Sequence, residues 1–277
     1  MLRRKDNKLR DLYQYLREQI ENLPTIWNIS RYHTKGISLG QFFGTLWEYI
    51  DPLMRSFIYY FVFVVMFKRT NGQGLPEAPW LVLGLGIWFF YGMAIMAGAK
   101  SIQFQISLFG QAKFPISILP TIEMFKQFTT LYGMGIVAIL LAIHYGYYPT
   151  LYYLQLPYYI FALFMTTLAF SLLFSTIIVI FRDFSHILDY IFRFALYISG
   201  AAIDLSIMDA LPIQIRQALL INPFIYCMEG FRDAIFSRGW FWQRPGLMIV
   251  FWAFTIGLLV VASHLHMKLR NQFMDYV

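Results

Sequence analysis

Three long runs of uncharged, mostly apolar residues dominate the chain, at 80–99, 127–143 and 245–263. Each is close to the length of about 20 residues that an α-helix needs to cross a hydrocarbon layer roughly 30 Å thick. Charged side chains make up only 13% of the 277 residues, about half of what an ordinary soluble domain has. Because so few charges cannot cover a folded globule in water, we expect an all-α integral membrane protein.

Three further spans are predicted from runs that are longer or less pure. In the uncharged run 151–181, Pro157 suits a first helical turn, because its missing N–H has no intrahelical partner there, so we place this span at about 156–181. The other two are expected at about 41–67 and 187–206. In each, an acid and a base stand four residues apart and can neutralise one another on one helix face. These pairs are Asp51 with Arg55 and Asp189 with Arg193.

The connections between the six predicted transmembrane helices indicate their orientation. With the N-terminus inside, the inner segments are 1–40, 100–116, 182–187 and 268–277, and the outer segments are 68–79, 144–155 and 207–244. The inner set holds more Lys and Arg than the outer set, as cytoplasmic loops do. We therefore expect a multi-pass protein of the plasma membrane with both termini cytoplasmic.

Residues 1–40 form a segment of their own before the transmembrane domain, 41–277. Apolar side chains recur there at helical spacing, with Asp11 and Glu18 on the opposite side, and Pro24 is expected to end the helix. The apolar set is Leu9, Leu12, Tyr13, Leu16, Ile20 and Leu23. This pattern predicts an amphipathic helix that lies on the anionic lipids of the inner leaflet. A solvated tail, or a helix packed on the protein's own surface, is the alternative.

Two connections are longer than a reversal of direction requires. Residues 104–115 allow one short cytoplasmic helix, which is either a docking surface for a partner or a plain connector. Residues 207–244 indicate a helical hairpin in the outer leaflet, with a plain extracellular loop as the alternative. Asn222 and Pro223 are typical of a helix start. Seven residues later, Glu229 and Arg232 are three apart and can pair.

The chain lacks the motifs by which it would carry out chemistry itself. It has no G-x-x-x-x-G-K-[ST] loop to bind nucleotide phosphates, no G-x-S-x-G and no H-E-x-x-H. Cys227 is the only cysteine, and the five histidines lack ligand spacing. We expect no catalytic residue, no metal site and no cofactor bound by this chain, so any use of ATP requires a partner.

Short motifs in a shared order extend over nearly the whole chain. They are the runs 40–52 and 113–120, the pair Arg182 and Asp183, the set Asn222, Pro223, Tyr226, Glu229 and Arg232, and the tail residues Lys268, Arg270, Phe273 and Asp275. Together with the predicted helices, they resemble the ABC-2 type permeases. Among these the chain is most similar to polysaccharide exporters, and within that group to the permease of wall teichoic acid transporters.

The resemblance implies a transport subunit that is not itself an enzyme. Two permease chains would form one pathway, and two copies of a separate phosphate-loop ATPase, which bind ATP and Mg²⁺, would dock on the cytoplasmic face. The substrate would be an anionic polymer on a polyprenyl diphosphate lipid, moved from the inner to the outer side of the membrane. O-antigen and capsule exporters share this plan, and no nucleic acid is involved.

Residues are assigned to these roles as expectations. ATPase coupling is expected at Gln111, Lys113, Phe114, Pro115, Arg182 and Asp183. The aromatic lining of a substrate path is expected at Trp47, Phe57, Tyr60, Phe61, Phe194 and Tyr197. Arg31 and Lys35 are expected to hold the diphosphate at the inner leaflet through charge-assisted hydrogen bonds, and Asn222, Pro223, Glu229 and Arg232 to build the outer hairpin.

Two other classes of protein compete with this interpretation. An ion-coupled secondary transporter would use intramembrane carboxylates such as Asp51, Asp189 or Asp204, and would work without an ATPase. A membrane enzyme that modifies a polymer would need a polar catalytic cluster at one interface. The sequence offers no such cluster, which makes the enzyme the weaker of the two.

Overall fold

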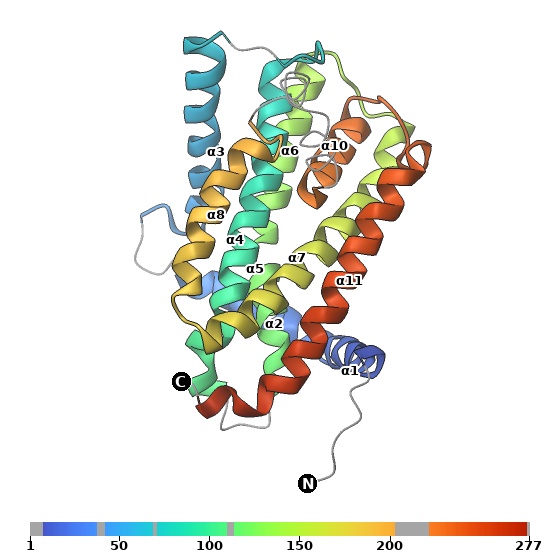
Figure 1. The fold of residues 1–277 in the computed structure, drawn as a ribbon. Helices are drawn as coiled ribbons and strands as arrows, with labels where there is room; N and C mark the ends of the chain where they lie inside the picture. The colour runs from blue at the N-terminus through green and yellow to red at the C-terminus, as the bar shows by residue number, and fades with distance from the viewer. Residues whose placement is uncertain (1–7, 38–41, 69–70, 110–113, 203–221, 276–277) are drawn as a thin grey trace.

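The computed structural model describes residues 8–37, 42–68, 71–109, 114–202 and 222–275, with side chains described at all of these except 32–37, 45, 107–109 and 274–275. Within this part of the chain every regular element is a helix (Figure 1). The longer helices are α1 (Lys8–Glu21), α2 (Leu23–Ile37), α3 (Trp47–Tyr60), α4 (Glu77–Phe109), α5 (Leu119–Lys126), α6 (Phe128–His144), α7 (Leu156–Ile180), α8 (Phe184–Ile198), α10 (Pro223–Ile235) and α11 (Pro245–Leu269). Short 3₁₀ or π turns extend them at η1 (Gly44–Leu46), η2 (Phe61–Met66), η3 (Ile116–Ile118), η4 (Leu151–Gln155), η6 (Phe241–Gln243) and η7 (Arg270–Asp275).

Five of the described helical stretches are long and apolar enough to cross a membrane. They are Trp47–Met66, Glu77–Ile106, Ile116–His144, Leu151–Ile180 and Pro245–Phe273. The prediction of an all-α integral membrane protein is thereby confirmed. The sixth predicted span, 187–206, stays a prediction, because α8 has 15 residues and 203–206 lie outside the described residues.

Helices α4 and α7 form the centre of the bundle. Helix α4 packs against α5, α6 and α7, and α7 packs in turn against α11. Small residues line the buried side of α7, among them Ala162, Ala169 and Ser171, and small side chains let membrane helices approach closely. The hydroxyls of Thr166 and Thr167 donate to carbonyl oxygens one turn earlier, at 2.9 and 2.7 Å. These two buried hydroxyls are therefore satisfied within the helix, as a water-free surrounding requires.

Helices α3 and α8 lie at the edge of the bundle, and both pack against α4 (Figure 1). Only Pro52 and Ser56 of α3 are buried. Pro52 cannot donate an intrahelical hydrogen bond, and the Ser56 hydroxyl donates to the Pro52 carbonyl oxygen at 2.9 Å. The charged residues of this predicted span, Asp51 and Arg55, therefore lie on a helix that is mostly exposed in the single chain.

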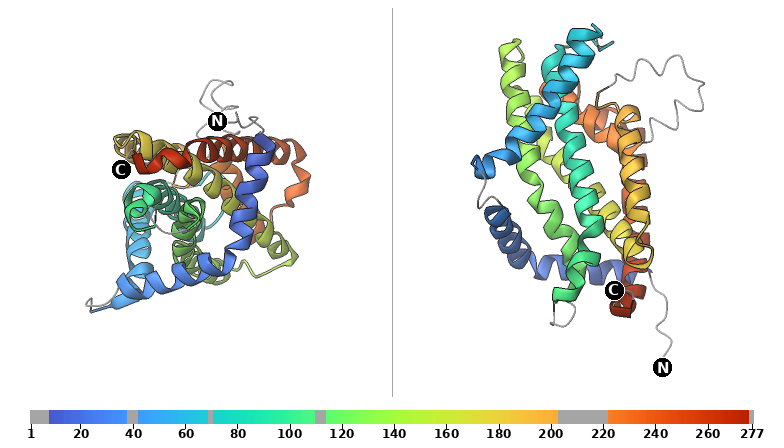
Figure 2. Two further views of the ribbon diagram at one scale, coloured as in Figure 1. Left: turned by 90° about the horizontal axis from the view of Figure 1, so that it is seen from below. Right: turned by 90° about the vertical axis from the view of Figure 1, so that its left-hand side faces the viewer.

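The N-terminal segment forms two helices where the sequence predicted one. Helix α1 ends at Glu21, and Pro24 lies in the first turn of α2, which continues to Ile37. Pro24 thus starts a helix instead of ending one, because proline needs no hydrogen-bond partner in a first turn. Figure 2 shows α1 and α2 lying across one end of the bundle, which we call the inner end, while α10 lies at the opposite, outer end.

The separate short helix expected over 104–115 is not found in the described residues. Helix α4 continues without a break through Lys100 to Phe109, so residues 104–109 are its last turns. Lys100 at the side of α4 contacts the Asp189 carboxylate at 3.4 Å, and Gln105 donates to Glu123 at 2.6 Å. These polar contacts with α8 and α5 let the helix extend beyond its apolar run.

Candidate functional site

The start of α10 is fixed by the residues that the sequence indicated. The Asn222 side chain accepts a hydrogen bond from the Phe224 backbone N–H at 3.0 Å, and Pro223 occupies the first turn. This is the capping geometry that satisfies a free N–H at a helix start. The first half of the predicted hairpin, 207–221, lies outside the described residues, so the hairpin itself stays a prediction.

Arg232 is the most deeply buried charge of the outer end. Its side chain is 0% exposed and pairs with Glu229 at 2.7 Å, which confirms the predicted pair. The guanidinium also lies 3.7 Å from the centroid of the Trp80 ring. Its Nη2 donates to the carbonyl oxygens of Trp80 and Ala201, at 3.4 and 3.2 Å. One side chain thus joins α10 to the first turn of α4 and to the chain that follows α8.

Arginines also pair with both carboxylates of α10. Glu229 contacts Arg238 at 2.9 Å, and Asp233 contacts Arg238 at 2.9 Å and Arg244 at 3.5 Å. Burial alone would raise the pKa of Glu229, but Arg232 and Arg238 outweigh it and hold this pKa below the ordinary value. For Asp233 burial wins, and its pKa is raised. The two carboxylates on one helix therefore differ in how readily they take up a proton.

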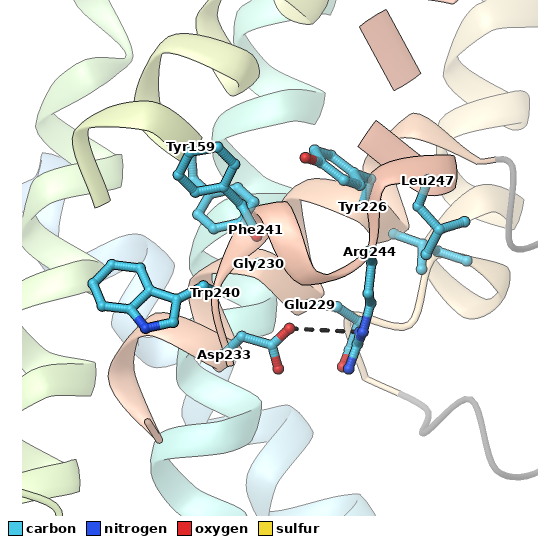
Figure 3. A pocket seen from close by; sticks show the side chains of 10 residues that line it. Tyr159, Tyr226, Glu229, Gly230, Asp233, Trp240, Phe241, Arg244 and Leu247 are labelled. Carbon is cyan, nitrogen blue, oxygen red and sulfur yellow. Dashed lines mark ion pairs between the residues drawn. The ribbon is translucent and has the colours of Figure 1, made fainter. Parts of the chain in front are cut away.

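A cavity of about 120 Å³ lies between α10, the start of α7 and the start of α11. Figure 3 shows Asp233 and Arg244 facing one another beside it, with the rings of Tyr159 and Phe241 above. Gly230 lies on its wall, and a side chain at this position would overlap the Tyr159 ring. The charged residues on its wall are paired with one another or with neighbouring arginines, so the arrangement holds α10 in place.

At the inner end, polar side chains hold α1 against the bundle. The Ser117 hydroxyl donates to Glu18 at 2.5 Å, and Arg270 donates to the same carboxylate at 2.8 Å. The Gln19 amide donates to the Ser117 carbonyl oxygen at 2.9 Å and accepts from the Thr121 hydroxyl at 2.7 Å. Helix α1 is thereby attached to η3, α5 and the end of α11.

The side of α1 that looked solvated is thus the docked side. Asp11 contacts His264 of α11 at 2.7 Å, while Leu9, Tyr13 and Ile20 are exposed. The helix packs on the protein's own surface, which was the alternative, and it also keeps an exposed apolar stripe of the kind that lies in a membrane interface. Burial would raise the pKa of Glu18, but its hydrogen bonds from Ser117 and Arg270 outweigh burial, and the pKa is lowered.

The residues expected to couple to an ATPase meet at this same inner end as far as they are described. Phe114 packs against a small apolar cluster that holds Ile118 and Val179. Val179 is three residues before Arg182, which is exposed together with Asp183. Pro115 precedes η3 in an extended conformation. Gln111 and Lys113 lie outside the described residues.

The aromatic residues expected to line a path lie on the outside of this single chain. Phe57 is 59% exposed and Phe194 68% exposed, with Trp47, Phe61 and Tyr197 exposed to similar degrees and Tyr60 half-buried. On α8 the exposed residues recur three and four apart, at 187, 190, 191, 194 and 197. They form a continuous aromatic and aliphatic face, so these residues enclose a path only if a second surface covers them.

Of the two charge pairs predicted within α3 and α8, the structure contains only the one in α3. Asp51 and Arg55 pair within α3 at 2.9 Å, as predicted. Asp189 instead contacts Lys100 of α4 at 3.4 Å, which corrects the expected pairing with Arg193. The Arg193 guanidinium lies 5.8 Å from the centroid of the Tyr190 ring. A cation on a neighbouring helix reaches the carboxylate, and no spacing pattern in the sequence indicates this neighbour.

Arg31 is exposed on α2 and borders a hollow of about 510 Å³ between α2, α5 and α6. Trp27 and Tyr132 border the same hollow. Lys35 lies in α2, and its side chain is outside the described part of the structure. Of the two cations expected at the inner leaflet, the structure therefore describes the side chain of Arg31 alone.

Comparison with known families decides what this architecture belongs to. The family model of the ABC-2 type transporters matches residues 26–236, from the first turn of α2 to just past the end of α10. The chain belongs to the ABC-2 type transporter family. This ABC-2 chain is also similar to the O-antigen export system permease protein RfbA of Myxococcus xanthus, with 26% identity over 271 residues that cover 97% of this chain and 98% of the relative.

Four residues of this ABC-2 chain that matter to the site were not found by sequence reasoning. Trp80 stacks on Arg232, Arg238 joins both carboxylates of α10, Gln19 attaches α1 and Lys100 contacts Asp189. Arg238 is only five residues beyond Asp233, but it lies past the end of α10, so helical spacing does not indicate this contact. The other three contacts join positions far apart in the sequence, where periodicity carries no information.

Proposed function

We propose that this chain is the transmembrane subunit of an ATP-driven exporter of a lipid-linked cell-surface polysaccharide. The observation that supports this most is the match to an O-antigen export permease over nearly the whole length of both chains. Membership of the ABC-2 family fits a permease that depends on a separate ATPase. The lack of a nucleotide-binding loop in the sequence fits the same division of labour.

Two copies of the chain would form one pathway. The faces of α3 and α8 that expose Phe57, Phe61, Phe194 and Tyr197 are the surfaces proposed to enclose it. Aromatic faces stack on sugar rings and tolerate a sliding polymer because they contact it without directional hydrogen bonds. Membrane lipid would cover these faces in a single chain.

Two ATPase chains, with their ATP and Mg²⁺, would dock at the inner end, which is the predicted cytoplasmic side. Phe114, Pro115, Arg182 and Asp183, together with Gln111 and Lys113, are the proposed contacts. Because α1 is bonded to Ser117 and to Arg270, a push on the segment before η3 would reach α1 and the end of α11 together.

The carrier lipid would approach from the inner leaflet, with its diphosphate held by Arg31 and Lys35. The polymer is proposed to be wall teichoic acid, and O-antigen or capsular polysaccharide is the alternative. Depletion of the chain should cause the polymer to accumulate inside the cell. A high phosphorus content in that polymer would support teichoic acid, and a polymer of sugars without backbone phosphate would support the alternative.

The first experiment is to purify the tagged chain from its native membranes and identify what remains bound. Recovery of a phosphate-loop ATPase in equal amount, with ATP-dependent export in vesicles, is the expected result. A chain that is recovered alone and transports with an ion gradient would overturn the proposal in favour of a secondary transporter. Asp51 and Asp189 are each in contact with a cation, which weighs against carboxylates of that kind as ion sites.

A further inference from the structure

The hollow beside Arg31 adjoins an apolar groove. Phe128 and Tyr132 border the hollow of about 510 Å³, and the same two residues border a second space of about 230 Å³ between α4, α6, α7 and α10. The groove then follows α6 past Gly135 to Ile139. Apart from the phenol of Tyr132, its lining side chains are hydrocarbon or aromatic. A cationic hollow and an apolar groove therefore lie side by side, with Phe128 and Tyr132 bordering both.

Aromatic residues mark the level of the cationic end. The Tyr49 hydroxyl of α3 and the Tyr132 hydroxyl of α6 are hydrogen-bonded at 2.9 Å, Trp47 lies in the first turn of α3, and the ring of Trp27 packs edge-on against Phe125 at 6.4 Å. Trp and Tyr gather where hydrocarbon meets headgroups, because one part of the ring system is apolar and the other is polar. Arg31 therefore lies at headgroup level, and the groove leads from it into the hydrocarbon.

The length of the groove limits which hydrocarbon chain fits it. From Phe128 to Ile139 the axis of α6 rises by about 16 Å at 1.5 Å per residue, which is about half of a hydrocarbon layer roughly 30 Å thick. This is the depth of one leaflet. A chain that belongs to one leaflet fits it, whereas a much longer hydrocarbon would have to leave it. Exposed Ile136 and Ile160 border the groove, so it is open to the bilayer along its side.

The charge of the site agrees with a single anion. Arg31 is exposed, and it forms no ion pair with any carboxylate that the structure describes. Ser30 lies at the same rim. A phosphodiester at headgroup level would accept two charge-assisted hydrogen bonds from the guanidinium.

We propose that this hollow and groove bind one anionic glycerophospholipid of the adjacent leaflet, with its phosphate on Arg31 and one acyl chain along α6. Arg31 is shared with the proposed diphosphate contact of the carrier lipid, but the groove belongs to the phospholipid alone. A change in the groove therefore separates the two proposals.

Gly135 provides a clean variant for the groove. No atom lies within 4 Å of the position that a Cβ would take there, so the side chain of Gly135→Leu begins in open space, and Gly135 itself lines the groove. Gly257 of α11 has the same open surroundings, which makes Gly257→Leu the matched control. For the cation, Arg31→Gln is matched by Arg17→Gln, because Arg17 is an exposed arginine that pairs with Glu21 within α1. Gly135→Ala leaves most of the groove open and should behave as the wild type.

The test is native mass spectrometry of the full chain, purified with whatever partner accompanies it and delipidated in mild detergent. Phosphatidylglycerol, phosphatidylcholine with the same acyl chains, a polyprenyl phosphate and inorganic phosphate are added in turn. We expect one phosphatidylglycerol to bind at least tenfold more tightly than phosphatidylcholine. Both Arg31→Gln and Gly135→Leu should weaken it at least fivefold, and the two control variants should leave it unchanged.

Equal binding of both phospholipids, or unchanged phosphatidylglycerol binding in Gly135→Leu, would overturn the proposal. Displacement by inorganic phosphate at similar concentrations would show an anion site without a lipid chain and would overturn it too. Polyprenyl phosphate that binds tightly and is insensitive to Gly135→Leu would assign Arg31 to the carrier lipid. The last result would disprove the phospholipid site without contradicting the proposed export function. A gel-filtration profile like that of the wild type confirms that each variant is folded.

Discussion

The guanidinium of Arg232 lies on the face of the Trp80 indole, with Cζ 3.7 Å from the ring centroid. A cation over an aromatic face gains most where water is excluded, and this arginine is fully buried. Because Trp80 belongs to the first turn of α4 and Arg232 to the last turn of α10, the contact joins the outer helix to the central helix of the bundle. Stability of the outer end should depend on this arginine more than on any ordinary surface charge.

Replacing Arg232 by methionine should destabilise the protein strongly. The change removes one of the two arginine partners of Glu229 and the side-chain donor to the carbonyl oxygens of Trp80 and Ala201, and breaking a buried pair typically costs about 3–5 kcal/mol. Thermal unfolding in detergent, followed by size-exclusion chromatography of heated samples, measures the loss. Arg17→Gln in the exposed pair with Glu21 is the control and should leave the unfolding temperature almost unchanged, because exposed ion pairs contribute little to stability.

Exchanging the two charges should not restore stability. From the sequence alone, the double variant Glu229→Arg with Arg232→Glu would be expected to rebuild the pair. In the structure a carboxylate at 232 would face two carbonyl oxygens and the electron-rich face of Trp80. We expect the double variant to melt at or below the temperature of the worse single variant, and a melting temperature near that of the wild type would contradict the role given to Trp80.

Gly230→Ala should destabilise the contact between α10 and α7. The added methyl group would overlap the ring of Tyr159, and overpacking of this kind typically costs about 1–3 kcal/mol. Gly257→Ala, in open surroundings on α11, should be neutral or stabilising, because alanine favours a helix over glycine by about 1 kcal/mol. The difference in melting temperature between the two variants is the measurement, and equal values would argue against close packing at Gly230.

Docking of α1 should weaken at low pH. The folded-state pKa of Glu18 lies below its ordinary value of 4.5, so the ionised carboxylate contributes stability that is present above that value and is lost as the pH falls through the lowered pKa. Amide exchange of residues 8–21, corrected for the intrinsic rate, should accelerate over this window. In Glu18→Gln the exchange should be faster at neutral pH and should lose this acid dependence. An unchanged acid dependence in that variant would assign it to another group.

Phe114→Cys should cross-link to the ATPase through a bifunctional thiol reagent. The native Cys227 is buried, and burial raises the pKa of its thiol to about 12, so it contributes little reactive thiolate at neutral pH. The natural sequence therefore serves as the unreactive background. Leu151→Cys, at an exposed position on η4 near the outer end, is the control, and cross-linking from there and not from Phe114→Cys would contradict the docking side.

The features that the sequence predicted correctly are local ones. The Asn222 cap and the Glu229–Arg232 pair depend only on spacing within one helix, and the long spans depend only on a run of apolar residues. Asp189 shows the limit: its expected partner was four residues away, but the contact is with Lys100, which is 89 positions distant. Helical periodicity tells which residues share a face and does not tell what that face meets.

The same limit applies to α1 and to the predicted path. Asp11 and Glu18 looked solvated because they lie opposite the apolar stripe, yet His264, Ser117 and Arg270 meet them in the fold. Composition alone was enough to propose the aromatic residues of α3 and α8 as the lining of a substrate path. Their exposure in a single chain depends on how the helices pack, which the sequence does not show.

The contact between Asp11 and His264 joins residues that are 253 positions apart. At a synthesis rate of about 5–20 residues per second, His264 is made roughly 13–50 s after Asp11. Helix α1 therefore leaves the ribosome before the other helices that the structure describes, but its contact with α11 can form only after α11 has been made. Until η3 and α5, which contact Glu18 and Gln19 in the fold, have also been inserted, the exposed stripe of Leu9, Tyr13 and Ile20 can hold α1 only on the bilayer, so the bilayer itself acts as its temporary partner during biogenesis.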